Sequence, residues 1–415
     1  MTSTPDTPDR PILAFSFPQF RLFWVTTLCA SFAAQIMSVS VAWEIWYLTG
    51  NAVYLALVGL AQFLPALSLV LVTGLVADRF PRRRIIQVAM GVEACCAAAL
   101  LIFALSGYGD VWPIFVVLVM LGTARAFVGP ATASLAPNLV PPEALANAVS
   151  MNAMAWQLAG ILGPVAAGLL LTISAPFAFC VAGVLALIAL TSISFIKSPP
   201  QHTQGQETSI QTLLAGFRYI WREKVVLGAI SLDLFAVLMG GAVALMPIFA
   251  TDILHAGPWA LGLLRAAPGI GAIAMALWLS RFPVRDHAGV ILFAFVAGFG
   301  FFTLGFGLST SIWLSVPLLV LIGACDMVSV SIRETIMQLW TPDEVRGRVN
   351  AVNSVFIGAS NELGEFRAGM MAAWIGAQAA VVFGGAATVA VAGIWSQAFP
   401  GLRKQRAIDR KMVEG

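Results

Sequence analysis

Charged residues are scarce in this chain. Lys, Arg, Asp and Glu together make up 10% of its 415 residues, whereas an ordinary soluble domain carries about 25%. So few charges cannot cover a surface that faces water. The composition therefore excludes a soluble enzyme, a nucleic-acid-binding protein and a disordered scaffold, and a net charge of only +3 offers little attraction to nucleic acid.

Cysteine and histidine are also too few, and too scattered, to build a metal or disulfide framework. The five cysteines are odd in number, lie in apolar runs and form no CxxC pair, so we expect small buried side chains. The three histidines share no spacing typical of metal ligands. Neither half contains the GxxxxGK[ST] loop that binds nucleotide phosphates. The sequence therefore predicts no cofactor, no metal and no use of ATP.

Apolar residues, in contrast, make up 59% of the chain. A membrane-spanning helix needs about 20 predominantly apolar residues, and the chain contains twelve such stretches between its charge and Gly/Pro breaks. They predict an all-α membrane protein with twelve transmembrane helices. The stretches are 21–48, 53–77, 85–106, 112–136, 145–172, 175–196, 225–252, 258–280, 288–308, 312–337, 346–372 and 374–398.

Positive charges indicate how these helices are oriented. Of 23 Lys and Arg residues, four lie deep inside predicted helices, namely Arg125, Arg265, Arg333 and Arg367. The other nineteen lie in, or within three residues of, the N-terminal segment, the even-to-odd connections or the C-terminal tail. Cytoplasmic segments carry such an excess, so both termini are expected in the cytoplasm. The expected parts are a cytoplasmic segment 1–20, a six-helix bundle 21–196, a linker 197–224, a second bundle 225–398 and a basic tail 399–415.

The linker contains two different patterns. Residues 197–209 are polar and rich in Pro, Gly and Gln, as linkers are. After them, the apolar residues fall on one face of a predicted helix. That helix would either lie in the membrane interface or pack its apolar face on the bundle, and the sequence leaves both open. The apolar residues are Ile210, Leu213, Leu214, Phe217 and Trp221.

The two halves are related by an internal repeat. A displacement of 201 residues brings Gly122 onto Gly323 and Asn152 onto Asn353, and a displacement of 202 brings the Arg-Phe-Pro sequence 79–81 onto 281–283. Two parallel six-helix halves with a site between them are a transporter architecture. The same register brings Arg125 onto Asp326, which predicts opposite charges at equivalent depths of the two halves.

Ionisable and amide side chains inside the predicted helices are the main candidates for function. A charge in hydrocarbon costs at least a few kcal/mol and normally faces a cavity or the bundle interior. Burial favours the neutral form of a carboxylic acid, whereas a nearby arginine favours the carboxylate, so a group of this kind can load and release a proton. The alternative is a static ion pair that fixes helix packing. The candidates are Glu93, Arg125, Asp233, Arg265, Asp326, Asn353, Asn361, Glu362 and Glu365.

Glu44 is a further candidate with a different expected position. It comes more than twenty residues after Arg21, so it is expected near the outer face of the membrane. The flanking Trp43, Trp46 and Tyr47 favour an aromatic interface belt over a role in the cavity.

The connection after the second stretch carries the first family resemblance. It reads Gly-Leu-Val-Ala-Asp-Arg-Phe-Pro-Arg-Arg-Arg over residues 74–84 and resembles the GxLaDRxGRR signature of the major facilitator superfamily, with proline where a glycine is usual. The resemblance implies a cytoplasmic gate that binds neighbouring helix ends in one transport state. Positive-inside topology alone would explain the arginines but not the acid. The gate residues are Gly74, Asp78, Arg79, Arg82 and Arg83.

Two more motifs follow in the order that the superfamily has. Arg125 with Gly129 resembles its second motif, and Gly163-Pro164 with Gly168 is similar to the antiporter motif of its proton-driven exporters. Segments 43–50 and 347–353 resemble the transmembrane secretion effector group, which includes the bacterial enterobactin exporter. The resemblance covers essentially the whole chain.

The resemblance implies a function. We expect a monomeric, proton-coupled transporter of the bacterial inner membrane that exports a small amphiphilic molecule, such as a siderophore or a drug-like compound, by alternating access. A proton-coupled importer of a siderophore or nutrient on the same scaffold, or a membrane sensor that transports nothing, are the alternatives. The direction of flux would distinguish the first two, and the absence of flux would indicate the third.

The predicted orientation can be tested with reporter fusions. An enzyme that is active only outside the cytoplasm should be active when fused at 107–111 or 253–257, because these connections carry no Lys or Arg. The same enzyme fused within 197–209 should be inactive. Activity in the reverse pattern would contradict the orientation.

Overall fold

The computed structural model describes residues 13–107, 109–197, 210–284 and 286–405, apart from a few side chains in 70–78 and 210–215, and these residues form helices and no β-strand. The first half begins with a short 3₁₀ turn, Ala14–Ser16, and contains six long helices. They are α1 (Pro18–Thr49), α2 (Ala52–Arg79), α3 (Arg82–Ser106), α4 (Trp112–Leu135), α5 (Leu145–Ile173) and α6 (Ala175–Phe195).

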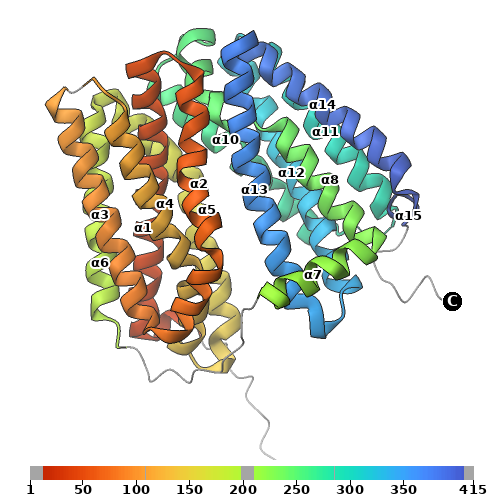
Figure 1. The fold of residues 1–415 in the computed structure, drawn as a ribbon, viewed down its shortest axis with the longest axis horizontal. Helices are drawn as coiled ribbons and strands as arrows, with labels where there is room; N and C mark the ends of the chain where they lie inside the picture. Colours follow the sequence, from red (N-terminus) through yellow and green to blue (C-terminus); the bar gives the residue numbers. More distant parts are fainter. Residues whose placement is uncertain (1–12, 108, 198–209, 285, 406–415) are drawn as a thin grey trace, which may run out of the picture.

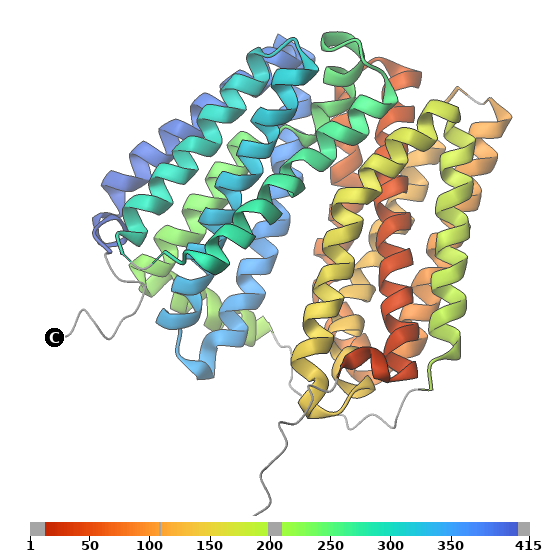
Figure 2. The same cartoon turned by 180° about the vertical axis from the view of Figure 1, so that it is seen from behind.

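The second half repeats this arrangement beside the first (Figures 1 and 2). It is preceded by α7 (Ile210–Arg222) and followed by the single turn α15 (Pro400–Arg403). Its first span is α8 (Lys224–Gly240), continued by the short turns Val243–Leu245, α9 (Met246–Ile248) and Phe249–Ile253. The other five are α10 (Pro258–Arg281), α11 (Ala288–Leu308), α12 (Ile312–Trp340), α13 (Asp343–Ile375) and α14 (Ala377–Ala398).

The prediction of twelve transmembrane helices in two bundles is confirmed. Eleven described spans are long and apolar enough to cross a membrane. The twelfth is α13, whose 33 residues occupy the matching place in the second bundle and carry more charge than the other spans. The predicted boundaries agree with the observed ones to within three residues.

Local chemistry explains several of these boundaries. Gly50 ends α1 with a φ of 55°, a left-handed conformation that glycine adopts at no steric cost. The Asn51 side chain then accepts a hydrogen bond from the backbone N–H of Val53 and begins α2. Ser174 caps α6 in the same way through the N–H of Phe177. These compact turns let consecutive helices return directly across the membrane.

The seventh span departs from the continuous helix expected over 225–252. Its α-helix ends at Gly240 and is followed by 3₁₀, α and π turns. Two consecutive glycines, Gly240 and Gly241, weaken the helix here. The guanidinium of Arg367 on α13 donates hydrogen bonds to the carbonyl oxygens of Leu238 (2.9 Å) and Met239 (2.6 Å), which stabilises the broken end.

The two bundles are joined mainly at one side of the membrane region. We call the side where α1 begins and α6 ends the terminal side, and the opposite side, with the turns at Gly50 and Gly376, the far side. One hydrophobic core at the far side includes residues of both halves, whereas the cores at the terminal side belong to one half each. The bundles accordingly approach at the top of Figure 1 and spread at the bottom.

Close helix packing makes the far-side contact. A Cβ atom at Gly168 of α5 would come within 2.9 Å of the Gly262 Cα of α10, so only glycine fits at this crossing. The indole Nε1 of Trp46 on α1 donates a hydrogen bond of 2.9 Å to the hydroxyl of Thr251 in the other half.

Helix α7 lies against the second bundle rather than apart from it. The hydroxyl of Tyr219 donates a 2.6 Å hydrogen bond to the carbonyl of Trp340, and Ile220 is buried. Phe217 stacks on Trp221 and meets Phe356 of α13 edge to face. Both Phe217 and Trp221 stay partly exposed. The predicted segment 198–209 and the side chains of Ile210, Leu213 and Leu214 lie outside the described residues.

The α5–α10 crossing yields a stability prediction. Gly168→Val should destabilise the protein by about 1–3 kcal/mol, because the added methyl groups must displace the backbone of α10. Thermal unfolding in detergent measures the loss. Gly160→Val is the matched control on the same helix, since a Cβ atom there meets nothing within 4 Å. Equal losses in the two variants would contradict the packing argument.

Candidate functional site

Arg125 on α4 is held by polar groups from three other helices of the first half. Its guanidinium donates to the side-chain oxygen of Gln62 on α2 (2.9 Å) and to the carbonyl of Ala34 on α1 (3.4 Å). It also forms an ion pair with Glu93 on α3, at 3.5 Å between Nη2 and Oε1. The Glu93 side chain is 4% exposed and that of Arg125 is 33% exposed. Arg125 therefore presents its charge to open space while Glu93 stays buried behind it.

That open space is a cavity of about 310 Å³ inside the first half. It lies between α1, α3 and α4 and extends along α1 from Ser38 to Thr26, toward the terminal side. Trp156 of α5 supplies an aromatic wall, and Gln35 and Ser38 add polar groups. The cavity thus combines one exposed cation with hydrogen-bonding and apolar surfaces.

Acids of the second half lie opposite this cation. Glu362 on α13 packs against α2 at Gly59, where a Cβ atom would come within 2.5 Å of its Oε2. From there its carboxylate is within electrostatic range of both Arg125 and Arg265. Glu362 of the second half therefore interacts electrostatically with Arg125 of the first half.

Arg265 on α10 makes the reciprocal contact. Its guanidinium donates to the hydroxyl of Ser38 on α1, 3.3 Å away, and it is within electrostatic range of Glu365 and Glu362. We call the five residues at this junction the central charge cluster. They are Glu93, Arg125, Arg265, Glu362 and Glu365.

Asp326 lies outside the central charge cluster, in a cavity of the second half. This cavity of about 200 Å³ is lined by the broken end of α8, by Asp326 on α12 and by Asn361 on α13. Among the described residues, the Asp326 carboxylate has no ion pair and no side-chain hydrogen bond, and Ser329 instead bonds its backbone carbonyl. Arg125 and Asp326, matched by the internal repeat, thus each face the cavity of their own half.

Asp233 on α8 has a different environment from the other acids. It forms an ion pair with Arg333 on α12, and the two side chains are only 13% and 4% exposed. Neither residue lines the two cavities. The pair therefore ties α8 to α12 inside the second bundle.

Two further candidates are distant from the cluster. Asn353 is buried near the terminal side of α13, nine residues and thus about 13 Å along the helix from Glu362. Glu44 is half-buried near the far end of α1, and its neighbours Trp43 and Trp46 pack against the core that both halves share. The structure does not bring either residue into the central charge cluster.

The arginines of the predicted gate contact the ends of neighbouring helices. Arg82 donates a 2.8 Å hydrogen bond to the carbonyl of Ser134 at the end of α4, and Arg83 donates to the carbonyl of Ser194 at the end of α6. These carbonyls belong to last turns, which lack helical partners. Arg79 is exposed. The side chains of Gly74 and Asp78 lie outside the described residues.

The Gly-Pro motif of α5 brings three helices together. A Cβ atom at Gly163 would meet the Gln35 side chain of α1 at 2.6 Å, and the carbonyl of Pro164 faces Gly262 of α10. Gly168 lies at the same crossing of the two halves. The motif therefore sits where α5 contacts both the first-half cavity and the other bundle.

Sequence reasoning missed three polar partners. Gln62 and Ser38 bind the two cluster arginines, yet a single neutral polar residue in an apolar helix gives little signal. Arg367 was recognised as a charge within a helix but not as a ligand of the carbonyls of α8. A local trace of this contact is the Gly240-Gly241 pair, which weakens the helix but lies within a continuous apolar run.

Comparison with known proteins gives matches along almost the whole chain. The family profile described as transmembrane secretion effector matches residues 11–413. Curated relatives include the enterobactin exporter EntS of Shigella boydii serotype 4, 26% identical over 343 residues, which cover 81% of this chain and 80% of the relative. EntS of Escherichia coli strain HS is 26% identical over 344 residues, with the same shares covered.

Solved structures share the fold. The nucleoside transporter NupG superposes with a TM-score of 0.68 at 13% identity, over 92% of this chain and 99% of that one. A bacterial homologue of the lysosomal transporter Spinster, in an inward-facing and unoccupied conformation, gives 0.69 at 15%, over 93% and 96%. The inward-open xylose transporter XylE from E. coli gives 0.68 at 12%, over 91% and 96%.

The Asp233–Arg333 pair yields a prediction about its role. Asp233→Asn should destabilise the protein by about 3–5 kcal/mol, because it leaves the buried Arg333 charge unpaired. The double variant Asp233→Leu with Arg333→Met should recover most of this loss, as measured by thermal unfolding. A single variant that stays fully stable but no longer transports would instead place the pair in the transport machinery.

Proposed function

Because the chain belongs to the transmembrane secretion effector family of major facilitator transporters, we propose that it exports a small amphiphilic molecule in exchange for protons. The bacterial inner membrane is the proposed location, with the terminal side in the cytoplasm. The relatives named enterobactin exporters support export, and a siderophore or a drug-like compound is the proposed substrate class.

The central charge cluster carries this proposal. It is the place where acids of the second half face Arg125 of the first, beside a cavity that extends toward the terminal side. Protonation of Glu362 or Glu365 removes a negative charge from this junction and weakens its attraction to Arg125 and Arg265. Binding of a proton and separation of the two halves are thereby coupled through one set of contacts.

The two cavities supply the proposed substrate site. The first-half cavity offers the Arg125 cation and the Trp156 ring, and the second-half cavity offers the Asp326 acid and the Asn361 amide. An amphiphile with apolar and polar parts matches such a mixed lining. A substrate group that pairs with the ionised Glu362 or Glu365 favours the carboxylate, so substrate and proton compete for the cluster, as exchange requires.

The contacts between the bundles are those of an inward-facing state under the proposed orientation. The shared core, the Trp46–Thr251 hydrogen bond and the Gly168–Gly262 crossing all close the far side. The first-half cavity reaches in the other direction, along α1 to Thr26. Export by alternating access then requires the far-side contacts to part while the terminal sides approach.

Transport by inverted membrane vesicles tests the proposal, with enterobactin as the probe. Vesicles that hold a proton gradient, acidic inside, should take up enterobactin and lose part of the gradient when the protein is present. Arg125→Ala should reduce both signals to those of vesicles without the protein, because the coupling cation is gone. Glu362→Gln should retain binding of the probe but abolish its dependence on the gradient.

Arg403→Ala is the matched control, since Arg403 is exposed on α15 and distant from the cavities. It should transport like the wild type. Uptake driven only in right-side-out vesicles would indicate an importer, and transport by Arg125→Ala at the wild-type rate would contradict the coupling role of the cluster.

A further inference from the structure

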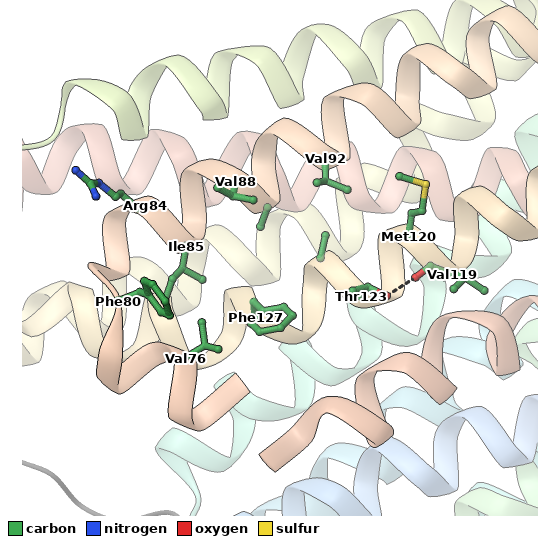
Figure 3. A pocket seen from close by; sticks show the side chains of 12 residues that line it. Val76, Phe80, Arg84, Ile85, Val88, Val92, Val119, Met120, Thr123 and Phe127 are labelled. Carbon is green, nitrogen blue, oxygen red and sulfur yellow. Dashed lines mark hydrogen bonds between the residues drawn. The ribbon is translucent and has the colours of Figure 1, made fainter. Parts of the chain in front are cut away.

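A long apolar groove lies on the outer surface of the first half, away from the transport cavities. It has a volume of about 600 Å³ and runs between α3 and α4, bounded at one end by the last turns of α2 (Figure 3). No lining residue belongs to the second half. Val88 on α3 and Met120 on α4 are exposed along it, at 67% and 46%. In a bilayer this surface faces lipid.

The walls of the groove are almost free of polar groups. Valine, isoleucine, phenylalanine, alanine and methionine side chains make up most of the lining. Thr123 contributes a hydroxyl, but this donates a 2.8 Å hydrogen bond to the carbonyl of Val119 in its own helix. The groove therefore offers nothing for a polar ligand along its length.

Among the described residues that line the groove, Arg84 is the one with a charge, and it lies at the terminal-side end (Figure 3). It is exposed and forms no ion pair or side-chain hydrogen bond within the described part of the chain. Its neighbours Arg82 and Arg83 are instead occupied by the carbonyls that end α4 and α6. Within the described residues, Arg84 is thus the one of these three consecutive arginines that is left for an external partner.

The depth of these features matches the profile of a phospholipid. Arg84 is in the first turn of α3, which begins at Arg82, so it lies at the membrane interface. Val92, at the other end of the α3 wall, is eight residues and thus about 12 Å deeper. The groove therefore has a cation at the depth of the lipid headgroups, and from there its apolar walls run toward the bilayer centre.

We propose that this groove binds an anionic phospholipid, with its phosphate on Arg84 and one acyl chain along α3 and α4. An arginine–phosphate contact is a charge-assisted hydrogen bond, and the positive end of the α3 dipole lies at the same place. Bulk lipid tails compete for the apolar groove on nearly equal terms. The headgroup charge therefore determines which lipid occupies it.

The internal repeat supports a site specific to the first half. With the displacement of 202 residues that matches the two connections, the position of Arg84 is taken by Asp286 in the second half. Its carboxylate lies 3.1 Å from the ring of His287 and would repel a phosphate. One half of the pseudo-symmetric protein thus has the cation for a headgroup and the other has an anion.

Native mass spectrometry of the full-length protein tests the proposal, after delipidation and titration with phosphatidylglycerol or phosphatidylcholine. The wild type should bind one phosphatidylglycerol more tightly than phosphatidylcholine. Arg84→Gln should weaken phosphatidylglycerol binding about fivefold to tenfold, the effect of one interfacial cation, and leave phosphatidylcholine unchanged. Val88→Trp should weaken both lipids by filling the groove.

Two matched variants serve as controls. Arg281→Gln removes an exposed arginine from the corresponding connection of the second half, and Ile102→Trp adds the same ring at an exposed position of α3 outside the groove. Both should bind lipid like the wild type, and size-exclusion chromatography should show all variants folded.

Equal phosphatidylglycerol binding by Arg84→Gln and the wild type would overturn the proposal. An equal loss in Arg281→Gln would overturn it as well, because the effect would then be one of bulk charge. If Val88→Trp left lipid binding unchanged but reduced enterobactin transport, the groove would belong to the substrate rather than to a lipid.

Discussion

The charge of Arg125 in an apolar helix bundle is the constraint on which the arrangement of the site depends. Removing an arginine from water costs several kcal/mol unless hydrogen bonds and an opposite charge replace the lost hydration. The first half supplies Gln62, the Ala34 carbonyl and Glu93. These groups do not surround the guanidinium completely, and the remaining side is open to the cavity and to Glu362 of the other half. Arg125, whose charge is only partly paired within the first half, thus interacts electrostatically with Glu362 and links the two bundles.

The repeat explains how the attraction between halves arises from a duplicated scaffold. Positions that determine helix packing have kept their residues, as Gly163 and Gly364 show. Positions that face the interior have changed their chemistry. Pro164 of α5 corresponds to Glu365 of α13, and Arg125 of α4 corresponds to Asp326 of α12. The geometry of the two bundles is therefore alike, while their interior charges are complementary.

The sequence predicts well where the helices begin and end, but it does not predict which side chains from distant segments meet. Both outcomes have physical reasons. Long apolar stretches and Gly/Pro breaks define spans locally, so the twelve spans agree with the structure to within three residues. The break after Gly240 was missed because an apolar run looks continuous across two glycines. The contacts of Arg125 and Arg265 with Gln62 and Ser38 join segments far apart in the chain, and no local pattern encodes such distances.

The arginines at the start of α3 have a mechanical consequence. Under the alternating access proposed above, the terminal side of the first bundle would move as one rigid lever, because Arg82 and Arg83 fasten α3 to the ends of α4 and α6. The shared core at the far side would then act as its fulcrum. Over a helix of 25 residues, about 37 Å long, a tilt of about ten degrees at the fulcrum displaces the other end by about 6 Å. A small displacement at the α5–α10 glycine crossing would thereby open a gap of molecular size at the terminal side.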